Sequence, residues 1–192
     1  MGTSAFIARP TKAGYAGVHV QYDGSPPMIL PLLLAAYRFR FEGDVEAMSR
    51  HLVDGVFAWD TIGTDLLDGA PPALVARLTG GEERSSQEMT DVLDDDSKPA
   101  KRLLVTHKNS AGHIWGYVLH RAGIEVISRQ LDIRGPVVLW HNDPRARFGG
   151  EMALWTLSTP PPISMPLDLP RLTPVPAKPT PSPKAAPAQP RL

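Results

Sequence analysis

Cysteine is absent from the sequence. Disulfide bonds, thiolate zinc sites and cysteine nucleophiles all require a thiol, so this absence excludes all three. A chain without cysteine also suits a reducing compartment. Side-chain chemistry therefore has to come from hydroxyl, carboxylate, imidazole and cationic groups.

Long apolar runs are missing as well. No stretch approaches the roughly 20 apolar residues that a membrane-spanning helix needs. The first residues, MGTSAFIARPTKAGYAG, lack the continuous apolar segment that follows the charges of a signal peptide. We therefore expect no membrane partner and a cytoplasmic location.

Neither sign of charge predominates, because 20 Lys and Arg residues balance 20 Asp and Glu residues. A polyanion is held nonspecifically by a positive field, and this composition supplies none. Nucleic acid is therefore an unlikely partner by composition.

Motifs of high information content are also missing. The chain has no GxxxxGK[ST] phosphate loop, no GxGxxG after a strand, no HExxH pair and no GxSxG elbow. No motif in the sequence therefore supports ATP binding, dinucleotide binding or zinc-protease activity. We expect no cofactor and no metal.

Proline is abundant, and 12 of the 21 prolines lie between Pro160 and Pro190. Few large apolar residues remain there to offset the entropy of ordering the chain. We predict a single domain over residues 1–157 and a disordered, extended tail over 158–192. The tail is either a linker or, through its PxxP spacings, a docking segment for a partner.

The first part of the chain predicts two strands and two helices. A short apolar run over 4–8 is followed by turn chemistry over 9–17 and by a second strand over 18–23. Two prolines after Ser25 predict the first helix, and Asp44 caps a second that ends near Gly55.

The remainder predicts one short helix and four strands. Pro71 and Gly80 bound the helix. A three-residue loop ending in Gly123 predicts a hairpin with His120 opposite Ile124. These elements predict an α+β fold, a mainly antiparallel sheet with the N-terminal helices packed on one face. The four strands are expected over 102–107, 113–120, 124–131 and 135–140.

The corner between the second strand and the first helix is the principal candidate site. His19 and Asp23 share a strand face but lie roughly 13 Å apart at the rise of a strand, too far for an acid–base pair. The candidate contacts for a ligand at this corner, beside the positive end of the helix, are instead His19, Tyr22, Asp23 and Ser25. The alternative, which we favour, is that Asp23 and Gly24 only form the turn.

Three other polar groups are weaker candidates. An acidic triplet offers oxygen ligands but lacks the alternation and central glycine of an EF-hand. Three histidines on adjacent predicted strands lack zinc-site spacing, and two arginines near a turn offer a phosphate contact. For each group a solvated surface is the favoured alternative. The groups are Asp94 to Asp96; His107, His113 and His120; and Arg145 with Arg147.

The segments MGTSAFIARP, GVHVQYDGSP and LLLAAY give the chain a family resemblance. It resembles short proteins from actinobacteria, phages and plasmids that open with Met-Gly/Ser-Thr, a short strand and an Asp-Gly before a proline. The resemblance covers residues 1 to about 155 and implies a mobile-element setting. It implies no activity and no catalytic residues. Ser25 stands where many members have an aromatic residue.

Two functions follow as hypotheses. The first is a non-enzymatic cytoplasmic accessory protein that binds a protein partner. The second is a small hydrolase or ligand-binding enzyme at the corner, with His19, Tyr22 and Asp23 as contacts. Nucleic-acid binding through Arg145 and Arg147 is a third, weaker hypothesis.

Overall fold

The structure is a computed structural model of the chain, and it describes residues 2–90, 97–98, 102–129, 133–146 and 148. The predicted tail over 158–192 and the predicted domain boundary at residue 157 lie outside the described residues. Asp94 to Asp96 and Arg147 lie outside them as well.

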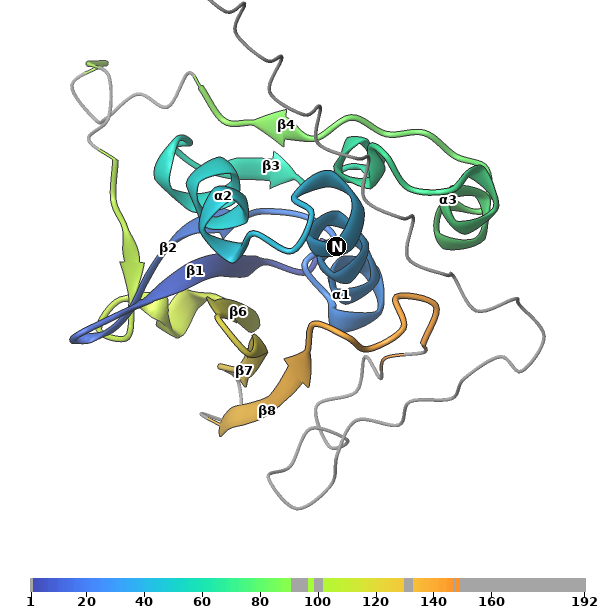
Figure 1. Cartoon of the computed structure of the whole chain (residues 1–192). Coiled ribbons are helices and arrows are strands. Elements are labelled where there is room, and N and C mark those ends of the chain that lie inside the picture. Colours follow the sequence, from blue (N-terminus) through green and yellow to red (C-terminus); the bar gives the residue numbers. More distant parts are fainter. Residues whose placement is uncertain (1, 91–96, 99–101, 130–132, 147, 149–192) are drawn as a thin grey trace, which may run out of the picture.

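One mixed sheet forms the centre of the molecule, with the strand order β4-β3-β2-β1-β6-β7-β8 and β5 paired to β2 (Figure 1). The pairs β1–β6 and β2–β3 are parallel, and the other pairs are antiparallel. The prediction of a mainly antiparallel sheet is confirmed. The strands are β1 Ala5–Thr11, β2 Gly14–Val20, β3 Trp59–Thr61, β4 Gln87–Glu88, β5 Val105–Thr106, β6 Trp115–His120, β7 Gly123–Ser128 and β8 Ile133–Leu139.

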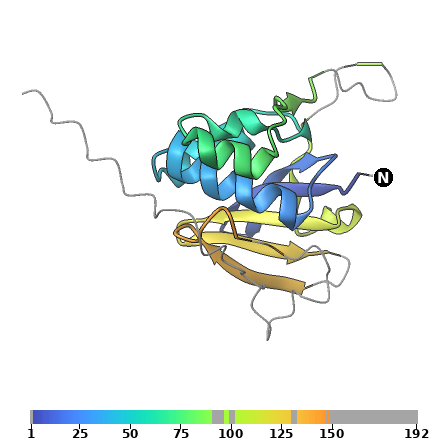
Figure 2. The same ribbon diagram turned by 90° about the vertical axis from the view of Figure 1, so that its right-hand side faces the viewer.

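Three α-helices lie on one face of this sheet, as Figure 2 shows. They are α1 Pro26–Ala35, α2 Val45–Ser49 and α3 Pro72–Thr79. The first two continue into π-helical turns over Ala36–Arg40 and Arg50–Asp54. The predicted packing of the N-terminal helices on one face is therefore observed. None of the helices in the described part of the chain is long and apolar enough to cross a bilayer.

The main core lies between the helices and the sheet. Ile7 and Val18 from the strands, Leu33 from α1 and Met48 from α2 are all fully buried in it. Burying a side chain of this size contributes about 1.5–3 kcal/mol. α3 lies outside this layer, where its Leu74 packs against the C-terminal end of α1. The helices thus form a cover with α1 beneath α3.

The face of the sheet opposite the α-helices is curved. The Arg134 guanidinium on β8 lies 5.9 Å from the centre of the Tyr15 ring on β2, although β1, β6 and β7 separate these strands. In a flat sheet those strands would be about 19 Å apart. We call this side the concave face. Its small core comprises Phe6, Ala8, Tyr15, Val105, Val118 and Ile127.

Local predictions failed at two hairpins. Residues 9–17 were expected to be a turn, but strands β1 and β2 run through them and turn only at residues 12–13. His120 pairs with Gly123 rather than with Ile124, because the β6–β7 loop has two residues. Gly123 is needed for packing and not for the turn, since a Cβ there would lie 2.3 Å from the Val138 carbonyl oxygen.

Candidate functional site

The corner between β2 and α1 is fixed by contacts to β1 and β6. Asp23 has the left-handed backbone angle φ 58°, which Asp tolerates better than most residues. The Gly24 amide donates to the Thr3 carbonyl at 2.9 Å, and the buried Tyr117 hydroxyl donates to the Gly24 carbonyl at 2.7 Å. A Cβ on Gly24 would lie 2.4 Å from the Ala5 Cβ. The Asp-Gly sequence therefore suits a close backbone approach.

The first turn of α1 offers a ligand no free amide. Pro26 and Pro27 lack the N–H group, and the Met28 and Ile29 amides both donate to the Ser25 carbonyl at 3.0 Å. Anion binding at a helix start depends on such free donors. The backbone amides of this turn are therefore not available to hold an anion.

The predicted corner residues are dispersed. The Asp23 carboxylate accepts a hydrogen bond from the Arg84 guanidinium at 2.9 Å. Tyr22 is half exposed, and its hydroxyl accepts a hydrogen bond from the side-chain amide of Gln21 at 2.8 Å. Ser25 makes no side-chain cap. His19 lies on the concave face instead, 3.0 Å from His113. The structure does not bring the four predicted residues together.

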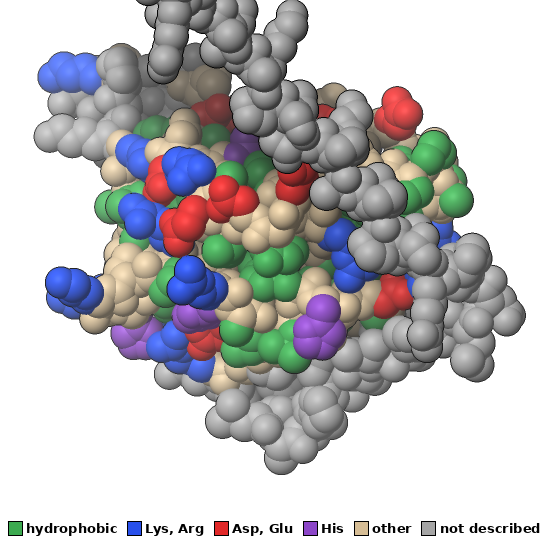
Figure 3. Space-filling view, viewed as in Figure 1, with side chains coloured by type: hydrophobic (Ala, Val, Ile, Leu, Met, Phe, Trp, Pro, Cys, Tyr) green, Lys and Arg blue, Asp and Glu red, His purple; other side chains and the backbone are tan. Residues whose placement is uncertain are grey.

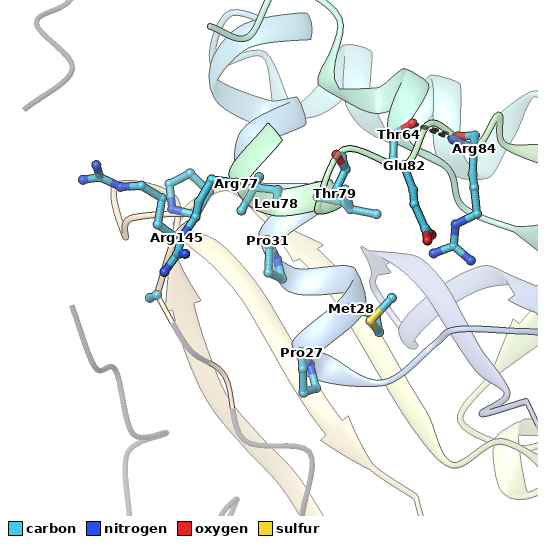
Figure 4. Close-up of a pocket in the computed structure, with 13 residues that line it drawn as sticks. Pro27, Met28, Pro31, Thr64, Arg77, Leu78, Thr79, Glu82, Arg84 and Arg145 are labelled. Atoms are coloured by element: carbon cyan, nitrogen blue, oxygen red, sulfur yellow. Dashed lines mark hydrogen bonds between the residues drawn. The ribbon is translucent and has the colours of Figure 1, made fainter. Parts of the chain in front are cut away.

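A cleft of about 420 Å³ lies beside this corner, between α1 and α3 (Figure 4). α1 forms its floor, the end of α3 forms one wall, and the turn after β8 forms the other. We call it the α1–α3 cleft. Its lining comprises Pro27, Met28, Pro31, Leu32, Thr64, Arg77, Leu78, Thr79, Glu82, Arg84, Pro144, Arg145 and Ala146.

Three arginines and one carboxylate, Glu82, provide the charge of the lining. Arg84 is half exposed and pairs with Asp23. Arg145 is largely buried and holds Asp143 through its Nε at 2.8 Å and through its Nη2. The Arg145 hydrogen bonds hold the pKa of Asp143 below its ordinary value despite partial burial.

Arg77 differs from the other two arginines. It is exposed at the end of α3 and makes no ion pair or hydrogen bond with its side chain among the described residues. Its charge is therefore available to an incoming group.

Apolar side chains complete the floor of the α1–α3 cleft. Pro27 and Met28 are exposed on α1, and 43% of Met28 is accessible. Leu32 and Leu78 lie beside them and are only partly covered. A ligand that fits this lining must combine an apolar group with an anionic one.

The described lining lacks a pair of groups for covalent chemistry. The Thr64 hydroxyl donates to the Arg84 carbonyl at 3.0 Å and accepts from the Arg84 amide at 2.9 Å. The Thr79 hydroxyl accepts from the Gly81 amide at 3.0 Å. Neither has a histidine beside it in the lining to act as a general base. Both hydroxyl groups of the lining are thus already engaged in hydrogen bonds to the backbone.

Charges of both signs mix on the neighbouring surface over α2 (Figure 3). Arg9 lies 2.8 Å from Asp54, and Arg50 lies 4.0 Å from Asp44. The face seen in Figure 3 therefore presents paired charges rather than a continuous basic patch.

The histidine group proposed from the sequence does not meet as a trio. His113 contacts His19, whereas His120 bonds Glu125 at 2.8 Å. His107 places its ring 6.4 Å from that of Tyr15. No cluster of three or more His, Cys, Asp or Glu residues suited to a metal ion occurs among the described residues.

The helix α3 was predicted from the sequence, but its place as a wall of the cleft was not. Arg84 is held at the site because the Thr64 amide donates to the Arg84 carbonyl at 2.6 Å, which joins two loops that are distant in sequence, while Arg77 lies at the end of α3 and Glu82 in the loop after it. Among the charged residues of the lining, Arg145 alone was a candidate from the sequence, because it follows a predicted turn.

Comparisons of the chain with protein-family models, with curated proteins and with solved structures found no match. Any statement about function therefore depends on the chemistry of the described residues.

Proposed function

We propose that the protein is a non-enzymatic accessory protein whose α1–α3 cleft binds a segment of a protein partner carrying an acidic residue next to an apolar one. The observation that carries this proposal is the lining itself. It joins arginines to exposed apolar side chains and lacks a nucleophile with an adjacent base.

Arg77 is the first contact that we assign to the partner's carboxylate. A hydrogen bond to a charged group is worth about 1.5–3 kcal/mol. The exposed Asp23–Arg84 pair can exchange partners at small cost, since such pairs contribute only about 0–1 kcal/mol. Two cationic groups at the edge of the cleft are thus open to an acidic segment.

Met28 and Leu78 are the contacts that we assign to the partner's apolar side chain. Covering apolar surface contributes about 25 cal/mol per Å². Since Met28 is 43% accessible in the free protein, its burial by a partner adds to affinity. Charge complementarity then sets the orientation of the segment.

The cellular location of the protein and its genetic context are part of the same proposal. We propose a cytoplasmic location, which a chain without cysteine suits. Resemblance to proteins of actinobacteria, phages and plasmids supports a role near mobile elements. The partner itself is identified only by the chemistry that the cleft selects.

Selection from a random peptide library on the full chain tests this function. We expect enrichment of sequences that place Asp or Glu beside Leu, Ile, Met or Phe. Affinity for a selected peptide, measured by calorimetry, should fall at least about tenfold in Arg77→Glu, equivalent to about 1.4 kcal/mol.

Arg121→Glu is the matched control, because Arg121 is exposed in the β6–β7 loop and does not line the cleft. It makes the same change in charge and should leave the affinity unchanged. Equal losses in both variants, or selection of peptides without an acidic residue, would refute the proposal.

A further inference from the structure

A second arrangement of polar groups lies on the concave face, away from the α1–α3 cleft. His19 on β2 and His113 just before β6 are 94 residues apart in sequence, yet His19 Nδ1 lies 3.0 Å from His113 Nε2. Both rings are partly buried. Neither ring takes part in the function proposed above.

Hydrogen bonding determines which nitrogen of each ring carries the proton. His113 Nδ1 lies 3.3 Å from the Ser110 carbonyl oxygen, which can only accept, so Nδ1 carries a hydrogen. His113 Nε2 therefore presents its lone pair, and His19 Nδ1 donates to it. Both rings are neutral in this arrangement.

The surroundings favour the neutral rings as well. Burial lowers the pKa of His19. Burial lowers the pKa of His113 too, and the nearby His19 and Arg129 lower it further, against the bond to Ser110. Neutral imidazole is the form that binds a metal ion.

We propose that His19 and His113 form a two-histidine site for a divalent transition-metal ion of the Zn²⁺, Ni²⁺ and Cu²⁺ class. Two nitrogen ligands at about 2.0–2.1 Å from one ion, with an angle of about 90–110°, lie about 2.9–3.4 Å apart. The observed separation of 3.0 Å falls in that range.

Binding requires one exchange of tautomer. The proton on His19 Nδ1 moves through solvent to His19 Nε2, which leaves the Nδ1 lone pair free for the ion. His113 keeps its Nδ1 proton and binds through Nε2. No net proton is released, and His19 Nε2 has no hydrogen-bond partner among the described residues that would resist the exchange.

His113 is held in place by its neighbours. Its bond to the Ser110 carbonyl is the contact that commonly orients a metal-binding histidine. Ser110 is itself buried and bonds the Tyr15 hydroxyl at 2.8 Å. Phe6 packs its ring against His113 at 5.4 Å between centres. Because these contacts already order the ring, it loses little conformational entropy when it binds an ion.

Two protein ligands leave coordination positions for water or for an added anion. The positive charge of Arg129 near His113 weakens cation binding and favours an anion in an open position. Mg²⁺ and Ca²⁺ prefer oxygen ligands, which this pair does not supply. The sequence named His19 and His113 as candidates in two separate groups but did not predict their pairing, because their spacing matches no zinc motif.

Calorimetric titration of the untagged full chain with Zn²⁺, Ni²⁺, Cu²⁺ and Mg²⁺ tests the proposal. We expect one ion per chain, with Cu²⁺ bound most tightly and Mg²⁺ not bound. His19→Gln and His113→Gln should each weaken binding at least about tenfold. His107→Gln and His141→Gln, which change exposed histidines, should leave it unchanged.

Nuclear magnetic resonance of the ring nitrogens gives a second measurement that does not depend on the variants. In the unmodified chain, Zn²⁺ should shift His19 Nδ1 and His113 Nε2 and leave the His141 nitrogens in place. Absence of binding by all three transition metals, or undiminished binding in His19→Gln and His113→Gln, would overturn the proposal. Shifts at His107 or His141 alone would overturn it equally.

Discussion

The helix-covered face and the concave face of the sheet organise their polar groups differently. On the helix side the polar groups lie at the rim of a large apolar core and come from loops, as Arg84 and Arg145 do. On the concave side they stand on a strand or directly beside one and bond one another across the sheet, as His19 on β2 and His113 just before β6 do. On the helix side, polar residues from loops thus line a cleft. On the concave face, polar residues on or beside strands form fixed pairs.

A second network shows the same property of the concave face. The Glu125 carboxylate accepts from Arg134 Nε at 2.7 Å, from Arg134 Nη2 at 2.8 Å and from His120 Nε2 at 2.8 Å. Its side chain is only 11% accessible. By contrast, the Asp23–Arg84 pair beside the cleft is open to solvent. The Glu125 network on the concave face therefore stabilises the fold. The Asp23–Arg84 pair beside the cleft can instead exchange its hydrogen bond for one to a ligand.

Leu33→Ala on the helix side should cause the largest loss of stability, about 2–5 kcal/mol, because it leaves a cavity in the main core. Leu139→Ala on the concave face removes a side chain that is 40% accessible and should cost far less, about 0.5 kcal/mol. Urea unfolding at neutral pH measures both. Similar losses would contradict the assignment of the main core to the helix side.

Gly24→Ala should destabilise the corner by about 1–3 kcal/mol, because its Cβ would lie 2.4 Å from the Ala5 Cβ and 2.8 Å from the Thr3 carbonyl oxygen. Gly112→Ala is the matched control, since a Cβ there meets nothing within 4 Å. Thermal unfolding of the two variants compares them. A Gly24→Ala variant as stable as the control would show that the close approach at the corner does not exist.

Glu125→Gln should cost about 1–3 kcal/mol at neutral pH, because it breaks charge-assisted hydrogen bonds on the concave face. Burial raises the pKa of Glu125, but the hydrogen bonds from Arg134 and His120 outweigh burial and hold the pKa below its ordinary value.

A lowered carboxylate pKa stabilises the fold above the ordinary pKa and loses this effect as pH falls through the folded value. The difference in unfolding free energy between wild type and Glu125→Gln should therefore shrink below about pH 4. A difference that is constant from neutral to acid pH would show that the carboxylate is not held by these bonds.

Asp23→Asn should have the smallest effect, at most about 1 kcal/mol, because asparagine also tolerates the left-handed backbone and only an exposed ion pair is lost. Circular dichroism during heating measures it. If this variant folds normally but loses an activity of the wild type, Asp23 has a catalytic role and the structural account of the corner fails.

The sequence was most informative where one residue determines a local shape. Two prolines after Ser25, Asp44 as a cap and Gly80 as a stop predicted the three helices, because each acts within one turn. The Asp44 carboxylate does accept from the Glu46 and Ala47 amides at 2.9 Å.

We did not predict strands β3 and β4 or the α1–α3 cleft, because all of them depend on residues that are far apart in the sequence. β4 has two residues, both exposed, and pairs with β3 across 25 or more intervening residues, so no local periodicity marks it. The His19–His113 contact and the meeting of Arg77 with Arg145 in one lining likewise depend on long-range pairing. Only the folded chain brings such residues together.

The methyl signals of the full chain, recorded with and without a selected acidic peptide, test the proposed function most directly. The account predicts that Met28 and Leu78 shift, while Val137 and Leu139 on the concave face do not. Shifts confined to Val137 and Leu139 would place the partner on the concave face and contradict the assignment of the α1–α3 cleft.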